Sequence, residues 1–266
     1  MNPGRKIVRA TIVIFLLTFL SRFLGLGREM AIAYRFGATG ETDAFMLALT
    51  IPNIFYNVIG TALAAVIVPV FEDYEIQGRR PEIWRALSVI VNFIIVAMGT
   101  GVLLGATGSS FIVRALGPGF PPETMQLAIN LTALMMPSIV LITLAGVFGG
   151  ILNANHVFGP VALGPVAMNL AIIVSALVGF YHWGIYNLAL GTVTGALLFA
   201  LIQIPALRQV GFKYAFLLNV QDPAVRQMLK MIGPILIVTG VFQIYSVIDV
   251  RFASNLEAGS IAALNY

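Results

Sequence analysis

Residues 7–36 read IVRATIVIFLLTFLSRFLGLGREMAIAYRF, and this stretch decides how the rest of the chain is interpreted. Its first half is a lipid-soluble helix, because Ile7 to Leu20 holds a single charge. Arg22 then lies roughly 22 Å along the helix axis from Ile7, at a rise of about 1.5 Å per residue. That depth is inside a hydrocarbon layer about 30 Å thick. An arginine there costs about 2.5–3.5 kcal/mol, so it usually faces water, a partner or a ligand.

Arg28 and Glu29 extend this charged region beyond Arg22. Arg22, Gly25 and Glu29 share a face at spacings of i, i+3 and i+7, whereas Arg28 lies about 120° from Arg22 on an ideal helix. The Gly-Leu-Gly step that ends at Gly27 can relax that angle. Two interpretations are open: helix capping and structural ion pairs, or a hydrated cavity that presents cations to an anionic substrate.

The composition identifies a polytopic membrane protein. Of the 266 residues, 59% are hydrophobic and 10% are charged, against about 25% charged residues in soluble domains. The chain has no cysteine, so it has no disulfide and no thiol-ligated metal. His156 and His182 fall in predicted short loops, which leaves little for a metal site.

Motifs of enzymes are missing from the sequence. It holds no H-E-x-x-H, no phosphate-binding G-x-x-x-x-G-K-[ST] and no G-x-S-x-G. We therefore expect a transporter and not an enzyme, with no cofactor, no metal, no catalytic residue and no nucleic-acid partner.

Seven hydrophobic runs approach the roughly 20 residues that a helix needs to cross a bilayer. They are 7–33, 43–70, 83–107, 125–152, 158–180, 184–206 and 229–252, and an eighth begins near Gly259. The runs are continuous and not alternating, which predicts helices and an all-α polytopic membrane protein.

The basic residues predict the orientation, because cytoplasmic loops carry an excess of Lys and Arg. Ten of them fall on one side of the membrane if the N-terminus is cytoplasmic, and two, Arg35 and Arg114, fall on the other. The ten are Arg5, Lys6, Arg9, Arg79, Arg80, Arg85, Arg208, Lys213, Arg226 and Lys230. The sequence therefore predicts a cytoplasmic N-terminus.

The longest polar connection divides the chain. Residues 207–228 are expected to form an amphipathic cytoplasmic linker along the membrane surface. They separate a six-helix N-terminal lobe, 1–206, from the start of a second lobe, 229–266. The chain stops a few residues into its eighth apolar run, so we expect a fragment of a longer transporter. A half-size transporter that works as a dimer is the alternative.

Asp43 and Asn53 are the candidate functional residues of the second run. Asp43 opens the run, where it either caps the helix or pairs with Arg28 or Arg35 and gates the outer mouth. Asn53 follows Pro52, which removes a backbone hydrogen bond, bends the helix and leaves a carbonyl that can line a cavity.

Further breaks and polar residues follow along the chain. Breaks like that at Pro52 are expected at Pro137, at Pro160 with Gly164-Pro165, and at Gly233-Pro234. Asn169 is a lone polar residue on an apolar helix, which is more typical of an interhelical hydrogen bond than of a ligand.

Asp249 is the acidic residue of the seventh run. Gln243, Ser246 and Asp249 recur every three residues and approximate one polar face. A carboxylate in a membrane helix indicates either an ion-coupling site for Na⁺ or H⁺ or a structural pair with a cation.

The run SRFLGLGRE at residues 21–29 resembles the S-R-x-L-G-x-x-R-[DE] signature of the MurJ (MviN) lipid II flippases, which belong to the multidrug/oligosaccharidyl-lipid/polysaccharide exporter superfamily. Further matches follow in the expected order. They are Phe36-Gly37-Ala38, Thr42-Asp43-Ala44-Phe45, Pro52-Asn53, Val68-Pro69-Val70-Phe71, Ile151-Leu152-Asn153, Gly259-Ser260 and Asn265-Tyr266. The resemblance covers the whole chain and about the first half of a family member.

The resemblance implies an exporter-superfamily architecture with a V-shaped cavity between two six-helix lobes. It implies translocation of lipid II, an undecaprenyl-pyrophosphate-linked peptidoglycan precursor, from the cytoplasmic to the outer leaflet of the bacterial inner membrane by alternating access. Cell-wall synthesis enzymes are candidate partners.

The resemblance also implies roles for individual residues. Arg22 and Arg28 match the arginines of the family's first helix, and Asp43 matches the acidic position of the second. With Glu29 and Asn53 they form the expected substrate site. Since the family couples to ions or membrane potential, Asp249 is the candidate cation ligand. Family members commonly carry basic residues where this chain has Tyr56-Asn57, so one expected cavity cation is missing.

Two other functions stay open. One is an exporter of the same superfamily that carries another lipid-linked oligosaccharide or a cationic drug, although a drug exporter is expected to have a mainly acidic cavity. The other is a non-transporting membrane scaffold that recruits cell-wall enzymes.

Overall fold

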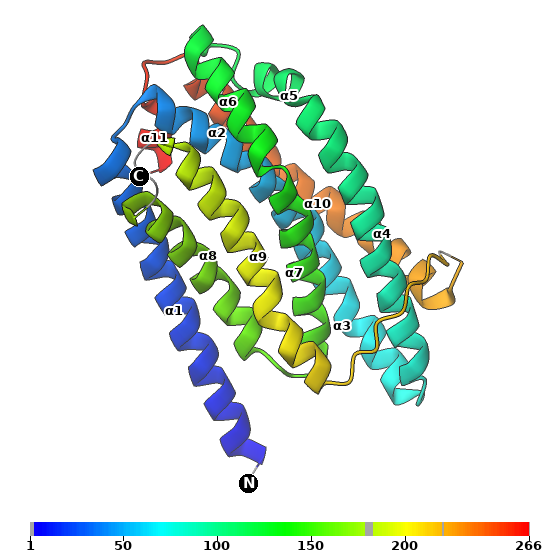
Figure 1. Ribbon diagram of the computed structural model, residues 1–266. Coiled ribbons are helices and arrows are strands. Elements are labelled where there is room, and N and C mark those ends of the chain that lie inside the picture. Colours follow the sequence, from blue (N-terminus) through cyan, green and yellow to red (C-terminus); the bar gives the residue numbers. More distant parts are fainter. Residues whose placement is uncertain (1–2, 179–182, 220, 266) are drawn as a thin grey trace.

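Figure 1 shows the computed structural model, which describes residues 3–178, 183–219 and 221–265, with side chains from Thr11 onward. All regular elements in these residues are helical. In chain order they are α1 (Pro3–Phe36), α2 (Gly40–Phe55), the π-helical turn η1 (Tyr56–Gly60), α3 (Thr61–Ile76), α4 (Arg80–Thr107), α5 (Ser109–Leu116), α6 (Pro122–Met135), α7 (Pro137–Ala154), α8 (Gly159–Val178), α9 (Tyr186–Gln209), α10 (Pro223–Ala253) and α11 (Ser260–Asn265).

Within the described residues, seven helical segments are long and apolar enough to cross a membrane. They are 11–36, 40–76, 80–107, 137–154, 159–178, 186–209 and 223–253. The prediction of an all-α polytopic membrane protein is confirmed. The N-terminus and the α3–α4, α7–α8 and α9–α10 connections lie at the same end of the bundle (Figure 1). Most of the basic residues lie at this end, in the connections and in the helix ends beside them.

Local sequence signals set several helix ends. Gly37 ends α1, with φ of 66° and its N–H donating to the Ala33 carbonyl at 2.9 Å. Thr39 caps α2 by accepting from the Thr42 N–H at 3.4 Å. Asp222 caps α10 in the same way, through a 2.9 Å bond from the Ala224 N–H.

The prolines act differently from one another. Pro137 separates α6 from α7, as predicted. Pro52, Pro165 and Pro234 instead lie inside continuous helices, so no helix ends at these positions, and the predicted bends stay predictions. The distortion near Pro52 falls a turn later, as the π-helical η1. A membrane helix can contain a proline because neighbouring helices can satisfy the backbone groups that the proline leaves without a hydrogen bond.

Two main cores hold the helices together. The first joins α3, α4 and α7 to the N-terminal third of α10, where the residues Ala224, Val225, Met228 and Ile232 are buried. The second joins α2, α6, α8, α9 and α11. Helix α1 lies at the edge of the bundle beside α8 (Figure 1). Its residues Phe15, Phe19 and Phe23 are more than half exposed, as expected of a face that meets lipid.

The connection between α9 and α10 is not helical. Its residues 212–219 have no regular secondary structure, and several of them bond to α4. Ser88 and Asn92 of α4 satisfy its backbone: the Asn92 amide donates to the carbonyls of Ala215 and Leu217 at 3.0 and 2.9 Å, and Tyr214 donates its hydroxyl proton to Asn92. The expected linker is thus fixed to a helix by hydrogen bonds.

Candidate functional site

Two adjoining cavities meet at the α2–η1 region. We call the first the Arg28 cavity. It has a volume of about 280 Å³ and is lined by Arg28, Asn53, Tyr56, Asn57, Ile142, Pro165, Met168, Asn169 and Phe199. The second, the Asp249 cavity, has a volume of about 550 Å³ and includes Thr50, Asn53, Asn57, Gln243, Ser246, Asp249 and Asn265 in its lining. Asn53 and Asn57 line both cavities, so a continuous polar surface joins Arg28 to Asp249.

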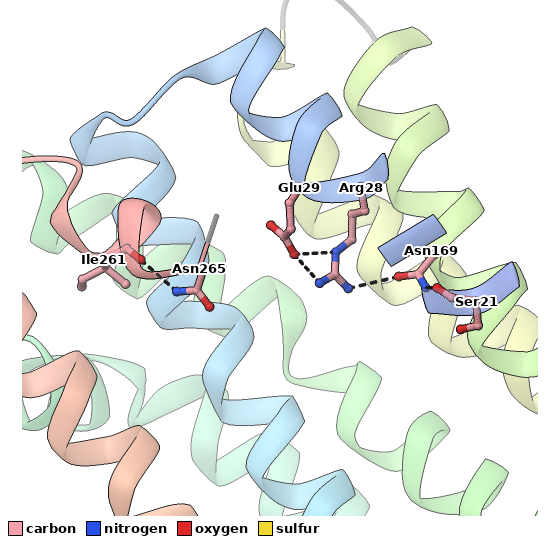
Figure 2. A network of polar contacts seen from close by, with 6 residues as sticks. All are labelled: Ser21, Arg28, Glu29, Asn169, Ile261 and Asn265. Atoms are coloured by element: carbon pink, nitrogen blue, oxygen red, sulfur yellow. Dashed lines mark hydrogen bonds and ion pairs between the residues drawn. The ribbon is translucent and has the colours of Figure 1, made fainter. Parts of the chain in front are cut away.

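Arg28, which lines the first cavity, is the centre of a network of polar contacts (Figure 2). Its Nε donates to Glu29 Oε1 at 3.0 Å, and its Nη2 donates to the same oxygen. Its Nη1 donates to Asn169 Oδ1 at 3.1 Å, and the Asn169 amide nitrogen donates to the Ser21 carbonyl at 3.1 Å. The network therefore links α1 to α8 across the cavity wall.

The ion pair of Arg28 and Glu29 is neither fully buried nor fully satisfied. The two side chains are 25% and 15% exposed. Glu29 Oε2 is inaccessible and has no hydrogen-bond partner among the described residues. A guanidinium in such a setting can offer its planar fork to phosphate oxygens. The arrangement suits an anion that competes with, or joins, the carboxylate.

The Asp249 cavity collects neutral polar groups around one acid. Gln243, Ser246 and Asp249 line it together, so the single polar face predicted for this helix is confirmed. The Asn57 amide donates to Gln243 Oε1 at 3.4 Å. Carboxylate, amide and hydroxyl oxygens are suitable ligands for hard cations.

Asp43 lines neither cavity and lies in a contact that we call the outer clasp, because it is at the end of the bundle opposite the N-terminus, which is the outer end in the predicted orientation. Its side chain is 3% exposed, and its two oxygens accept from the N–H groups of Gly259 at 2.6 Å and Ala262 at 2.8 Å. Gly259 has φ of 94°, and a Cβ there would lie 2.4 Å from the Ala38 carbonyl oxygen. Asp43 therefore caps α11, whereas Thr39 caps its own helix.

A second contact reinforces the outer clasp. Arg251 of α10 donates from Nη1 to the Ala115 carbonyl at 2.6 Å, at the end of α5. A Cβ on Gly119 would lie 2.4 Å from the Ser254 carbonyl oxygen. Backbone from the end of α10 thus packs directly against the connection between α5 and α6.

The structure brings Arg28, Glu29 and Asn53 together but leaves Arg22 outside both cavities. Arg22 is exposed, and its side chain has no ion-pair or hydrogen-bond partner among the described residues. Helix α1 continues unbroken through Gly25 and Gly27. The offset of about 120° between the two arginines is therefore kept, and the expected relaxation of that angle is absent.

Sequence reasoning did not assign three residues to the site: Tyr56, Asn57 and Asn169. The i, i+4 spacing of Asn53 and Asn57 could have placed both amides on one face. The predicted interhelical hydrogen bond of Asn169 is confirmed, but its second bond, to Arg28, also makes it part of the cavity.

The family model and the curated relatives that match this chain share one description. The family model for the lipid II flippase MurJ matches residues 32–266. A probable lipid II flippase MurJ of Buchnera aphidicola subsp. Baizongia pistaciae is 31% identical over 267 residues, which cover 98% of this chain and 52% of that protein. The lipid II flippase MurJ of Burkholderia cenocepacia is 30% identical over 270 residues, with the same coverage. The chain spans about half the length of the curated relatives it matches.

Solved structures agree with this assignment. A lipid II flippase MurJ in an inward closed conformation superposes with a TM-score of 0.81 and 28% identity, covering 96% of this chain and 53% of that one. An inward-facing multidrug resistance MATE transporter of the MOP superfamily superposes with a TM-score of 0.67 at 16% identity, which shows a shared fold alone. The expected exporter-superfamily architecture is confirmed. The chain belongs to the lipid II flippase MurJ family.

Proposed function

We propose that this protein takes part in moving lipid II from the cytoplasmic to the outer leaflet of the bacterial inner membrane, as a transporter without catalytic chemistry. Family membership supports the substrate class. The observation that carries the proposal is the partly exposed guanidinium of Arg28 in a polar cavity within a membrane-spanning bundle.

The physical problem for such a transporter is the pyrophosphate. Moving its charge through an apolar layer is strongly unfavourable unless the charge is paired and hydrogen-bonded. Arg28 supplies the pairing cation, and the amides of Asn53 and Asn57 supply further hydrogen bonds along the cavity surface. The isoprenoid tail stays in lipid while the head group occupies the cavity.

Alternating access requires one end of the pathway to close while the other opens. We assign the closed outer end to the outer clasp, in which Asp43 holds α11 and Arg251 holds α5. These bonds are made to backbone groups, which water can replace when the clasp opens. The side chains themselves need no new protein partner in the open state.

The remaining parts of the proposal concern energy and orientation. Asp249 is the candidate ligand for a coupling Na⁺ or H⁺, and membrane potential is the other energy source. The distribution of basic residues supports a cytoplasmic N-terminus. Cell-wall synthesis enzymes that use the flipped precursor are the expected partners.

Rescue of cells depleted of their own lipid II flippase tests the proposal. Arg28→Ala is expected to abolish rescue while membrane insertion stays normal, because the substrate loses its cation. Arg114→Ala removes an exposed arginine at the outer end of the bundle, in α5, and is the matched control that should still rescue. Normal rescue by a well-expressed Arg28→Ala variant would contradict the proposal.

A further inference from the structure

Asn169 connects α8 to the cation of the Arg28 cavity. It is 8% exposed and is surrounded by apolar residues of its own helix. Figure 2 shows its amide beside α1, between Arg28 and the Ser21 carbonyl. The amide oxygen accepts from Arg28 Nη1 at 3.1 Å, and the amide nitrogen donates to Ser21 O at 3.1 Å. Both ends of the amide are therefore in use.

The chemistry of its two partners fixes the orientation of this amide. A guanidinium can only donate hydrogen bonds and a carbonyl can only accept them. A flipped amide would face donor with donor at Arg28 and acceptor with acceptor at Ser21. Gly25 lies between these two residues on α1, and a Cβ there would already be in van der Waals contact with the Asn169 nitrogen at 3.9 Å. The amide therefore lies close to the α1 backbone at Gly25.

The hydrogen bonds of Arg28 leave some of its N–H donors available to a ligand. The group has five N–H donors in a planar fork. Glu29 accepts from Nε and Nη2, and Asn169 accepts from Nη1. One N–H on each terminal nitrogen therefore has no acceptor among the described residues. Two such donors on neighbouring nitrogens match two oxygens of one phosphate group.

The neutrality of Asn169 matters as much as its position. Arg28 and Glu29 together carry no net charge. The amide of Asn169 is neutral, so the net charge of the three-residue cluster is also zero. A carboxylate at position 169 would give the cluster a net negative charge and repel an anion. An apolar residue there would leave the guanidinium held on one side only, by Glu29.

We propose that Asn169 is a positioning residue that aims Arg28 at a phosphate group of the lipid-linked substrate, and that it must be neutral for the site to accept an anion. The proposal rests on the proposed function and specifies how its site recognises the pyrophosphate. It assigns to Asn169 a role beyond joining two helices.

Binding of undecaprenyl pyrophosphate to the protein at its natural length, in lipid nanodiscs, tests the proposal. Asn169→Leu is expected to weaken binding about tenfold, the value of one hydrogen bond to a charged group. Asn169→Asp is expected to weaken it about a hundredfold, because repulsion adds to the lost orientation. Adding Glu29→Gln to Asn169→Asp returns the cluster to zero net charge and should restore binding to within about tenfold of wild type.

The control variant separates the role of Asn169 from the general cost of a buried carboxylate. Asn92→Asp makes the same change in a buried asparagine of α4 that is bonded to backbone carbonyls and lines neither cavity. It should keep wild-type affinity. A loss of affinity in Asn92→Asp equal to that in Asn169→Asp would overturn the proposal.

The remaining outcomes distinguish this proposal from the proposed function. If Arg28→Ala binds as tightly as wild type, the proposed function fails. If Arg28→Ala loses binding but both single variants at position 169 keep it, the positioning role fails. Equal losses in those variants, with lowered thermal stability and no recovery in the double variant, would show that Asn169 only joins α1 to α8 and would also overturn it.

Discussion

The Arg28 cavity and the outer clasp each place a charge within or at the end of a membrane helix, but they satisfy it to different degrees. In the outer clasp, Asp43 is buried and both of its oxygens accept backbone N–H groups. In the Arg28 cavity, the guanidinium is a quarter exposed and its partner Glu29 keeps one oxygen without a hydrogen bond among the described residues. The first arrangement is closed to a ligand and the second is open to one.

This difference separates two reasons for placing a charge in a membrane protein. A carboxylate whose hydrogen bonds are all made by backbone stabilises one arrangement of helices, because losing a partner leaves buried donors unsatisfied. A cation that still has unpaired N–H donors can instead form new hydrogen bonds when an anion binds, and these bonds stabilise the complex. Burial and hydrogen-bond completeness, taken together, therefore distinguish a structural contact from a binding site better than charge alone.

The largest expected effect is that of Asp43→Ala on the outer clasp. The variant leaves the N–H groups of Gly259 and Ala262 buried without acceptors. We expect the local opening free energy to fall by about 3–6 kcal/mol, from two hydrogen bonds to a charged group. Hydrogen–deuterium exchange measured on a peptide covering residues 256–265 would report the loss of protection.

Glu41→Ala is the control for this measurement. It removes an exposed carboxylate from the same first turn of α2 and should leave that protection unchanged. If both variants exchange like wild type, the hydrogen bonds of Asp43 do not hold the outer end closed. The outer clasp would then not be a structural contact of the kind contrasted here with the Arg28 cavity.

A double substitution in the Arg28 cavity is expected to separate function from stability. Arg28→Met alone leaves Glu29 without its cation and should lower the free energy of unfolding by about 3 kcal/mol. Arg28→Met with Glu29→Leu replaces the pair with apolar residues and should unfold within about 1 kcal/mol of wild type. Thermal unfolding in detergent measures this, and flippase rescue of depleted cells should be absent in both variants.

The opposite result would remove the distinction between the two sites. A double variant that is as unstable as the single one would show that the Arg28–Glu29 pair holds the fold together as the outer clasp does. Rescue by the stable double variant would show that the pair has no part in transport.

Most of the fold could be predicted from the sequence because the bilayer imposes its own rules. Most of the hydrophobic runs matched the spans to within a few residues, since each must be long enough to cross. The fourth run, 125–152, is divided in the structure into α6 and α7. The break at Pro137 followed from its missing N–H. The π-helical turn η1 could not be predicted, because it depends on how residues 56–60 pack against α7, where a Cβ on Gly146 would lie 2.9 Å from the Cα of Gly60.

The candidate site was predictable only in part. Arg28 and Glu29 were identified because charges are costly at that depth. The partners of Asp43, Gly259 and Ala262, are more than 200 residues away in the chain and contribute only backbone groups, which carry no sequence signal. Asn169 is 141 residues from Arg28, and a lone asparagine on an apolar helix gives no indication of which helix it faces.

Arg22 provides the smallest and most discriminating test, because it shares α1 with Arg28 but is exposed and has no partner among the described residues. An exposed charge acts on a substrate through solvent, and salt screens it over about 10 Å at 0.1 M and about 3 Å at 1 M.

We expect Arg22→Ala to change the unfolding free energy by less than about 0.5 kcal/mol. It should weaken undecaprenyl pyrophosphate binding about fivefold at low salt, corresponding to about 1 kcal/mol. Raising the salt should remove most of that difference, whereas the loss in Arg28→Ala should persist, since direct hydrogen bonds in a cavity are screened much less. An effect of Arg22→Ala that is as large as that of Arg28→Ala and insensitive to salt would mean that both arginines contact the phosphate directly.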